Sequence, residues 1–275
     1  MKRIKRMILG LAVLLVAAFV LICGALYAMQ DRMIFPAPSG PNPTALVNAD
    51  LQEIVTPDGE RLAALWHAAE PGEGTVIFLH GNGTAIANLE PMIDALADRG
   101  FGVLVAAWRG YPGSTGRSSE QGIFIDAIAI HDFARARTDG PLAVVGESLG
   151  SGAAVHLAIE READALVLVS PYDSVRAVAS ARFPFLPVGT LLRHPFRSDE
   201  RIADVDEPIL IVHGTADQVI PINHGRALHA RAPAGAEFVE VPGATHFDIL
   251  DYTFGGIAVW LAERFAAVSN GARSG

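Results

Sequence analysis

The sequence predicts an α/β fold in which a mostly parallel sheet of about eight strands carries helices on both faces. Two observations support this prediction. Short, almost wholly apolar runs alternate along the chain with segments whose apolar residues follow helical spacing. A glycine-rich turn, Gly146-Glu147-Ser148-Leu149-Gly150, separates one such run from an alanine-rich helical segment. Continuous apolar strands are buried on both faces, which is typical of a parallel sheet.

The N-terminal segment differs from the rest of the chain. Residues 1–6 are strongly basic, and Met7 to Met29 then contains no charged residue over about 23 positions, enough to span a ~30 Å hydrocarbon core. A cleaved signal peptide is the competing interpretation, but its apolar part is usually only ~7–15 residues long. We expect residues 1–30 to form a cytoplasmic basic stub and an uncleaved transmembrane anchor, with residues 7–29 in the membrane. Because the positive charge precedes the span, the domain that follows is expected on the extracytoplasmic side.

Four prolines between Pro36 and Pro43 predict an extended linker over residues 31–50. Residues 51–268 are long enough for one α/β domain, and residues 269–275 are expected to form a flexible tail. The domain is predicted to open with an antiparallel hairpin, in which strands at residues 51–55 and 62–67 flank a turn.

The remaining elements follow from the same patterns. Strands are expected at residues 75–79, 101–107, 143–145, 165–169, 208–212 and 236–241, the last one alternating like an edge strand. Helices are expected at residues 86–97, 120–137, directly after Ser148, 221–230 and 255–268. Residues 183–192 are apolar and interrupted by proline. This segment is interpreted as a small cap over a cleft, as a surface that contacts lipid or an acyl chain, or as ordinary core packing.

Composition excludes several classes of function. The 275-residue chain has a formal net charge of −9 and no basic stripe in its globular part, so no nucleic-acid partner is expected. The single cysteine, Cys23, lies within the apolar N-terminal run, which argues against a disulfide framework and a thiolate metal site. No metal and no other cofactor is expected.

The G-x-S-x-G motif at residues 146–150 lies in the strand-to-helix context of a nucleophile elbow. Such a turn holds its serine in a strained conformation, with the hydroxyl exposed above the sheet. Gly146 and Gly150 have no side chains, as the close approach of strand and helix requires. The alternative interpretation is a tight connection that carries an ordinary surface serine.

A serine hydroxyl needs a base to take its proton and a carboxylate to orient that base. Behind a nucleophile elbow, these partners follow in the order acid, then histidine. Asp217 follows a buried strand at the end where α/β sheets bind ligands, and His246 lies in the loop after the last strand. We therefore expect Ser148, Asp217 and His246 to be catalytic. Less favoured substitutes are Asp173 as the acid and His80, His213 or His224 as the base.

Two backbone N–H groups are expected to form an oxyanion hole, those of Leu149, after the serine, and of Asn82, in the loop after His80-Gly81. His80 itself is expected to be structural. The loop from Arg109 to Arg117 lacks the spacing of a phosphate-binding loop and is interpreted as a rigid loop beside the site. Contact of either arginine with an anionic head group is the minor alternative.

Several motifs occur in a recognisable order along the chain. They are His80-Gly81-Asn82-Gly83, residues 109–116, residues 146–150, Ser170-Pro171-Tyr172, residues 213–217 and Gly243-Ala244-Thr245-His246. Together they resemble the membrane-anchored, small-cap branch of the α/β-hydrolase superfamily, which includes lysophospholipid lipases and protein depalmitoylases. The resemblance covers residues 53–265, with a minor departure at Gly83. It implies an α/β-hydrolase fold with a small cap, a Ser148–Asp217–His246 triad, no cofactor, and hydrolysis of an acyl ester or thioester.

The sequence therefore predicts a membrane-anchored serine hydrolase. Its expected substrates are carboxylic esters or thioesters of amphiphilic acyl compounds, including lipids, because the anchor keeps the site near a bilayer. Hydrolysis of amides or peptides by the same triad is one alternative. The other is a catalytically silent, membrane-tethered interaction module, although the presence of the complete triad argues against it.

Overall fold

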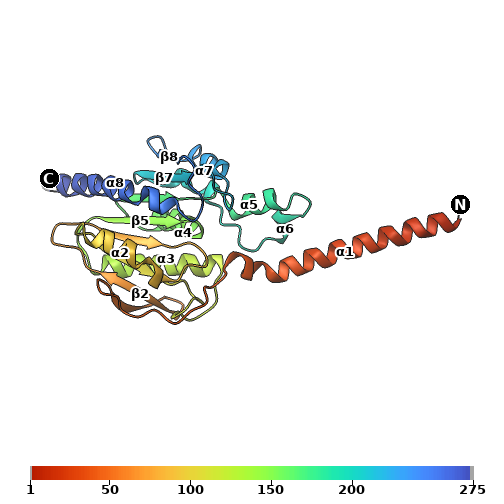
Figure 1. The fold of residues 1–275 in the computed structure, drawn as a ribbon, viewed down its shortest axis with the longest axis horizontal. Coiled ribbons are helices and arrows are strands. Elements are labelled where there is room, and N and C mark those ends of the chain that lie inside the picture. Colours follow the sequence, from red (N-terminus) through yellow and green to blue (C-terminus); the bar gives the residue numbers. More distant parts are fainter. Residues whose placement is uncertain (1, 273–275) are drawn as a thin grey trace.

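The computed structural model describes residues 2–272, in which an eight-stranded sheet carries helices on both faces and a long N-terminal helix projects from one end (Figure 1). The strands are β1 Asp50–Val55, β2 Arg61–His67, β3 Thr75–Leu79, β4 Gly102–Ala106, β5 Leu142–Glu147, β6 Ala165–Val169, β7 Ile209–Gly214 and β8 Glu237–Val241. The α-helices are α1 Lys2–Ile34, α2 Glu90–Ala97, α3 Glu120–Arg135, α4 Leu149–Glu160, α5 Val175–Arg182, α6 Val188–Leu191, α7 Ile222–His229 and α8 Ile249–Ala272. The predicted α/β fold is confirmed.

The strand order is β1-β2-β4-β3-β5-β6-β7-β8. The predicted hairpin forms one edge, since β1 pairs antiparallel with β2, and β2 pairs antiparallel with β4. All pairs from β4 across to β8 are parallel. Strands β3, β4, β6 and β7 are buried along their whole length, whereas every residue of β8 is exposed or half-buried, as in an edge strand.

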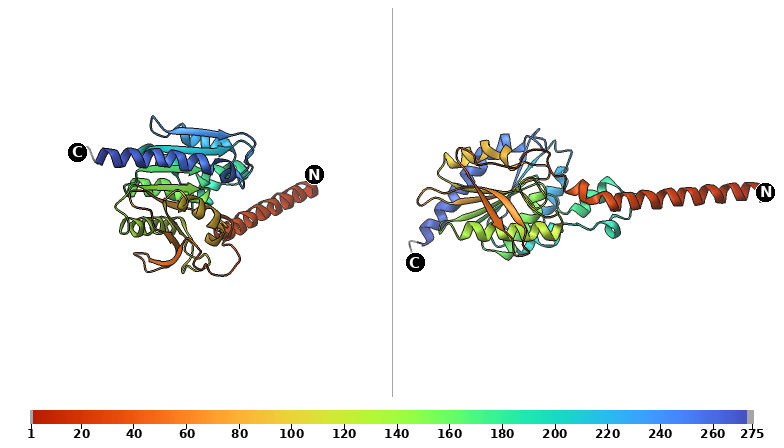
Figure 2. Two further views of the ribbon diagram at one scale, coloured as in Figure 1. Left: turned by 60° about the vertical axis from the view of Figure 1, so that its left-hand side comes forward. Right: turned by 90° about the horizontal axis from the view of Figure 1, so that it is seen from below.

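The helices form a layer on each side of the sheet. Figure 2 shows α2 and α8 on one face, with α3 and α4 together on the other. The carboxyl ends of the parallel strands point toward α1, so the loops after β3, β5, β7 and β8 gather at the end of the sheet from which the long helix projects (Figure 1). Loops at this end carry the ligand site in open α/β sheets.

Helix α5 was not predicted, α3 and α7 are shorter than expected by one or two residues at an end, and two helices differ more clearly from their expected bounds. The segment expected as one helix at residues 86–97 is a 3₁₀ turn, Ile86–Leu89, followed by α2. Pro91 explains the break, because proline has no N–H to donate and is tolerated only in the first turn of a helix. Helix α8 starts at Ile249 rather than at residue 255. Ile249 is fully buried, so its burial favours an earlier start despite the cost of Gly255 and Gly256 inside the helix.

Among the described residues, α1 is the one helix long and apolar enough to cross a membrane. It continues to Ile34, so residues 31–34 of the predicted linker are helical. Residues 35–49 have no regular structure, and most of them are exposed, but Phe35, Pro43 and Ala49 are buried. The segment is therefore attached to the domain at these three points. Of the predicted tail, residues 269–272 belong to α8, and residues 273–275 lie outside the described part.

Candidate active site

Ser148 lies between β5 and α4 with a strained backbone, at φ 49° and ψ −114°. A non-glycine residue in such a conformation costs about 1–3 kcal/mol and is held in place by its surroundings. A Cβ atom on Gly146 would lie 2.5 Å from the Cβ of Ala154, and one on Gly150 would collide with the carbonyl oxygen of Leu79. The two glycines thus allow strand and helix to approach closely enough to force the turn.

The three residues predicted to be catalytic meet in one hydrogen-bonded chain. His246 Nε2 lies 3.0 Å from Ser148 Oγ, and His246 Nδ1 lies 2.7 Å from Asp217 Oδ2. Ser148 is 7% exposed and Asp217 is 6% exposed, so the chain is largely shielded from water. The fold brings these residues together although they follow three different strands.

Asp217 is held as an anion. Its Oδ1 accepts hydrogen bonds from the backbone N–H groups of Val219 (2.9 Å) and Ile220 (2.8 Å). His213 Nε2 lies 3.5 Å from Oδ2. Burial alone would raise the pKa of Asp217, but hydrogen bonds from His213 and His246 outweigh burial and keep the pKa well below its usual value. An ionised Asp217 favours the His246 tautomer that carries its proton on Nδ1, in which Nε2 is an acceptor facing Ser148.

The substitute residues have other partners. Asp173 Oδ1 lies 2.8 Å from His224 Nδ1, and the same oxygen accepts the N–H of Ser174. His213 Nε2 lies 2.8 Å from the carbonyl oxygen of Ile220. The hydrogen bonds of His80, His213 and His224 all go to groups other than the serine, so the structure favours His246 as its partner.

The loop that carries Asn82 is fixed from several sides. Trp108 Nε1 donates to the carbonyl oxygen of His80 at 3.1 Å, and the N–H of Gly83 donates to the Tyr111 hydroxyl at 3.3 Å. A Cβ on Gly81 would lie only 3.3 Å from the Cβ of Ser148, so this loop lies directly beside the serine. Leu149 is the first residue of α4, where N–H groups have no acceptor within their own helix.

Three supporting residues were not identified from the sequence. They are Glu147, Tyr111 and His213. Glu147 Oε2 accepts the N–H of Gly81 at 3.4 Å, and burial raises the pKa of this carboxyl group. Glu147 was visible only as the variable position before the serine, whereas Tyr111 was part of the motif at residues 109–116 and His213 was considered only as a substitute base. Nothing in the sequence indicates which loop they support.

His80 is structural, as expected. Its ring is completely buried, with Nδ1 2.7 Å from the carbonyl oxygen of Gly81. Burial lowers the pKa of His80 to about 4, so the ring is neutral near pH 7.

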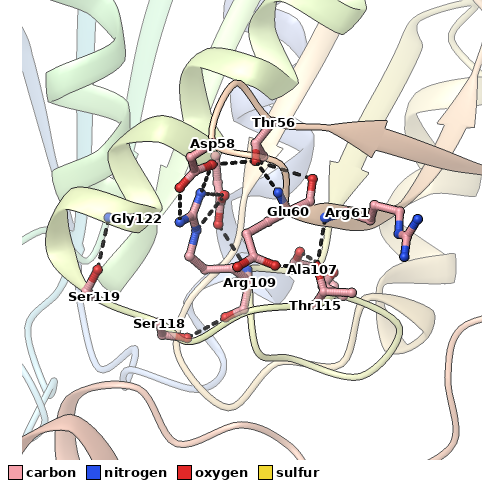
Figure 3. Close-up of polar contacts among 12 residues, drawn as sticks. Thr56, Asp58, Glu60, Arg61, Ala107, Arg109, Thr115, Ser118, Ser119 and Gly122 are labelled. Atoms are coloured by element: carbon pink, nitrogen blue, oxygen red, sulfur yellow. Dashed lines mark hydrogen bonds and ion pairs between the residues drawn. The ribbon is translucent and has the colours of Figure 1, made fainter.

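Arg109 is the centre of a closed polar cluster (Figure 3). Its guanidinium binds both oxygens of Asp58, at 2.7 and 3.0 Å, and lies 2.8 Å from Oδ1 of the fully buried Asp126. Burial would lower the pKa of Arg109, but the two carboxylates outweigh burial and raise it. Because its charge is already neutralised, Arg109 is not available to a head group, and the rigid-loop interpretation holds for this residue.

The apolar segment at residues 183–192 joins α5 to α6 and extends beyond α6. Neither helix contains a fully buried residue, and Phe185 is 90% exposed. The interpretation of this segment as core packing is therefore wrong. The cap and lipid-contact interpretations remain consistent with its position beside α1 (Figure 1).

Comparison with known proteins agrees with the observed fold. A family model described as the alpha/beta hydrolase fold matches residues 74–203. The protein Rv2307c of Mycobacterium tuberculosis is 35% identical over 257 residues, covering 90% of each chain. The chain belongs to the α/β-hydrolase family. The lysophosphatidylserine lipase ABHD12 of Macaca fascicularis is 32% identical to this hydrolase over 197 residues, which cover 63% of this chain and 50% of the relative.

Solved structures share the fold of this hydrolase. The esterase Pf2001 of Pyrococcus furiosus superimposes with a TM-score of 0.65 at 19% identity, covering 83% of this chain and 99% of the esterase. With a serine at its elbow, the chain is an α/β hydrolase of the serine type. Among residues 2–272, no group of three or more His, Cys, Asp or Glu side chains is arranged to hold a metal ion.

Proposed function

We propose that this chain is a membrane-anchored serine hydrolase that cleaves carboxylic esters or thioesters of amphiphilic acyl substrates. Ser148 is the nucleophile, His246 the general base and acid, and Asp217 the residue that orients His246. The observation that carries the proposal is the continuous chain from Asp217 Oδ2 through His246 to Ser148 Oγ, with links of 2.7 and 3.0 Å.

In the acylation step, Ser148 Oγ attacks the carbonyl carbon as its proton passes to His246 Nε2. The carbonyl oxygen becomes an oxyanion, which accepts hydrogen bonds from the N–H groups of Leu149 and Asn82. When the tetrahedral intermediate collapses, the bond to the leaving alcohol or thiol breaks. His246 gives its proton to the leaving group, and the acyl group stays on Ser148 as an ester.

Deacylation repeats these steps with water. His246 Nε2 takes a proton from a water molecule as the water oxygen attacks the acyl carbon. A second oxyanion forms and accepts hydrogen bonds from the N–H groups of Leu149 and Asn82. Collapse of the second intermediate returns the proton to Ser148 Oγ and releases the carboxylic acid. Asp217 stays ionised throughout and stabilises the imidazolium formed in each half-reaction.

The membrane part of the proposal rests on α1. We infer that residues 7–29 span a bilayer, with the basic residues 2–6 on the cytoplasmic side and the hydrolase domain on the other side. The loops that follow β5, β7 and β8 and carry the three residues lie at the end of the sheet nearest to α1 (Figure 1), which places them toward the lipid surface. The name of the lipase relative supports an ester substrate of lipid type.

The first test uses the full-length protein in detergent and a fluorophosphonate probe, which reacts with activated serines. We expect the wild type to be labelled, and Ser148→Ala and His246→Ala to lose labelling. Ser180→Ala, on an exposed position of α5, is the matched control and should be labelled like the wild type. A folded wild type that does not react would overturn the proposal and favour a silent interaction module.

A second measurement separates the reaction classes. Rates are compared on an ester, a thioester and an anilide that carry the same acyl group. We expect the ester and the thioester to be hydrolysed much faster than the anilide. A faster anilide reaction would instead assign the triad to amide or peptide hydrolysis.

A further inference from the structure

An apolar groove lies between the last turns of α1 and the cap helices α5 and α6. We call it the anchor groove; its walls include Leu26, Met33 and Ile34 from α1, and Val175, Phe183 and Leu192 from the cap segment. Its volume is ≈ 110 Å³. Figures 1 and 2 both show α5 and α6 beside the end of α1 nearest the domain. A cavity of about 150 Å³ lined by Leu, Ile and Phe stays dry and binds a hydrocarbon.

The side chain of Gln30, at the anchor groove, is already engaged in hydrogen bonds. Gln30 Nε2 donates to the carbonyl oxygens of Tyr27 (3.0 Å) and Leu191 (3.2 Å), and its Oε1 accepts the N–H of Arg193 at 2.7 Å. The Arg193 guanidinium lies 5.1 Å from the centre of the Tyr27 ring. The interior of the anchor groove therefore offers hydrocarbon contacts and few hydrogen bonds.

The two walls of the anchor groove are fixed to each other. Asp31 Oδ1 binds Arg193 Nη2 at 2.6 Å and lies 3.1 Å from His194 Nε2. Phe35, directly after α1, packs edge-on against the His194 ring with 5.1 Å between centroids. These contacts join the anchor helix to the segment after α6, so the groove is part of the folded structure.

Both walls also lead to the candidate active site. On the α1 side, the carbonyl oxygen of Ile34 accepts a hydrogen bond of 3.3 Å from Asn82 Nδ2, in the expected oxyanion loop. On the cap side, Val175 follows Tyr172, whose hydroxyl donates to the carbonyl oxygen of Leu149 at 3.0 Å. On its α1 side, the groove is thus connected by one hydrogen bond to the loop that carries Asn82.

We propose that the anchor groove binds the hydrocarbon chain of the acyl substrate, so that the anchor helix forms part of the substrate site. This inference rests on the proposed function, because it assigns the acyl chain of that reaction. Three observations select this occupant: the apolar lining, the direct link to the oxyanion loop, and a wall formed by the helix that carries the enzyme in lipid. Each methylene buried there favours binding by about fourfold, so the site selects for chain length.

The test compares a short and a long acyl chain on the full-length protein in phosphatidylcholine vesicles. Ala179→Trp fills the groove from α5 and Leu26→Trp fills it from α1, since both residues line it. The matched controls are Ala181→Trp, on an exposed position of α5, and Leu21→Trp, 73% exposed on α1. Rates are measured with p-nitrophenyl butyrate and p-nitrophenyl dodecanoate, and fluorophosphonate labelling confirms that each variant keeps a reactive site.

We expect both groove variants to lower kcat/KM for the dodecanoate by at least about tenfold and to change the butyrate value by less than about twofold. The two control variants should match the wild type on both esters. Because Leu26 lies on the anchor and Ala179 on the cap, one variant still tests the proposal if the other fails to fold.

Two outcomes would overturn the assignment of the anchor groove alone. One is an unchanged preference for chain length in all variants, which would mean that the groove only packs the two walls together or binds a bilayer lipid. The other is an equal loss on both esters, which would mean that the groove supports the catalytic loop. A labelled wild type that hydrolyses neither ester would overturn the proposed function, and this inference with it.

Discussion

Two polar networks in this hydrolase bury charged groups, and they differ in how completely those groups are paired. Around Arg109, the guanidinium is bound by Asp58 (Figure 3) and by Asp126, and the backbone N–H of Arg109 also donates to Asp126, at 3.0 Å. Around Ser148, the hydroxyl has a single side-chain partner, His246, and the backbone is held at a positive φ. The first network is closed, and the second ends at a strained serine.

This difference distinguishes buried charges that stabilise the fold from buried charges that support a reaction. A saturated cluster stabilises the fold and offers no group to a ligand. A chain that ends at a strained and partly shielded hydroxyl is held in place by its surroundings and leaves that hydroxyl available to attack a substrate, with its proton passing to His246. The predictions below test this division.

The largest effect is expected for Asp217→Asn. Asparagine keeps the shape of the side chain but favours the wrong tautomer of His246, so kcat for ester hydrolysis should fall by about 10⁴-fold. The midpoint of thermal unfolding, monitored by circular dichroism, should stay close to that of the wild type, which shows that the variant is folded.

Asp173→Asn is the matched control for this variant. Asp173 also follows a central strand and also contacts a histidine, His224, yet that pair is not part of the chain to Ser148. Its kcat should stay within about threefold of wild type. Equal losses in the two variants would contradict the assignment of Asp217.

The next largest effect is a loss of stability in Arg109→Met. Removing the guanidinium leaves the completely buried Asp126 without its counter-charge, which should cost about 3–5 kcal/mol in the free energy of unfolding. Urea denaturation measures this cost. Arg226→Met, which breaks an exposed pair with Glu240, should leave the denaturation midpoint unchanged. Destabilisation of similar size in both variants would argue against a special role for the Arg109 cluster.

Acid should reduce the stability of the fold through His80 at a higher pH than through Asp58. The pKa of His80 is lowered by burial from 6.5 to about 4, so between these pH values the unfolded chain binds a proton that the folded chain does not. The stability linked to His80 is therefore complete above pH 6.5 and is lost as pH falls toward 4, by about 3 kcal/mol. Hydrogen bonding to Arg109 lowers the pKa of Asp58 from 3.8 to about 2, so its contribution is lost only below pH 3.8.

Urea denaturation between pH 7 and pH 4.5 measures this dependence. Burial also lowers the pKa values of His156 and His194, so they contribute with the same sign. The comparison with His80→Gln isolates the contribution of His80, and the variant should lose less stability over this range than the wild type. Parallel pH profiles for the two proteins would contradict the prediction.

The smallest effect is expected for Tyr111→Phe. The variant loses the hydroxyl that accepts the Gly83 N–H at 3.3 Å, while the buried ring stays in place. Because Gly83 neighbours Asn82, a slightly displaced oxyanion loop should lower kcat by about three- to tenfold and leave KM unchanged. A change in KM alone would instead indicate that Tyr111 contacts the substrate.

The strands of the sheet were predictable because each one has a recognisable local pattern of apolar residues. Continuous apolar runs gave β3, β4, β6 and β7, and the alternating run at β8 gave the edge. Helix boundaries were less predictable. The start of α8 depends on the burial of Ile249, and the break before α2 depends on where Pro91 falls within the first turn.

The candidate triad was predictable because the order of its residues and their positions after strands are both visible in the sequence. The supporting residues were not, because their partners lie far away along the chain. Glu147 binds the N–H of Gly81, and Arg109 binds Asp58 and Asp126 across three segments. The contact of Gln30 with the segment after α6 depends on the end of α1 folding back onto the domain, which no local pattern indicates.

The junction after α1 also determines which molecules the enzyme can reach. Gln30 and Asp31 are bonded to the domain and Phe35 is buried directly after the helix, so no hinge separates the anchor from the catalytic end of the sheet. With α1 in a bilayer, the enzyme samples a two-dimensional pool of substrate. Its turnover should follow the mole fraction of substrate in the host membrane, and inert lipid should slow it by surface dilution. Vesicles that lack the protein should keep their substrate even when they are mixed with vesicles that contain it.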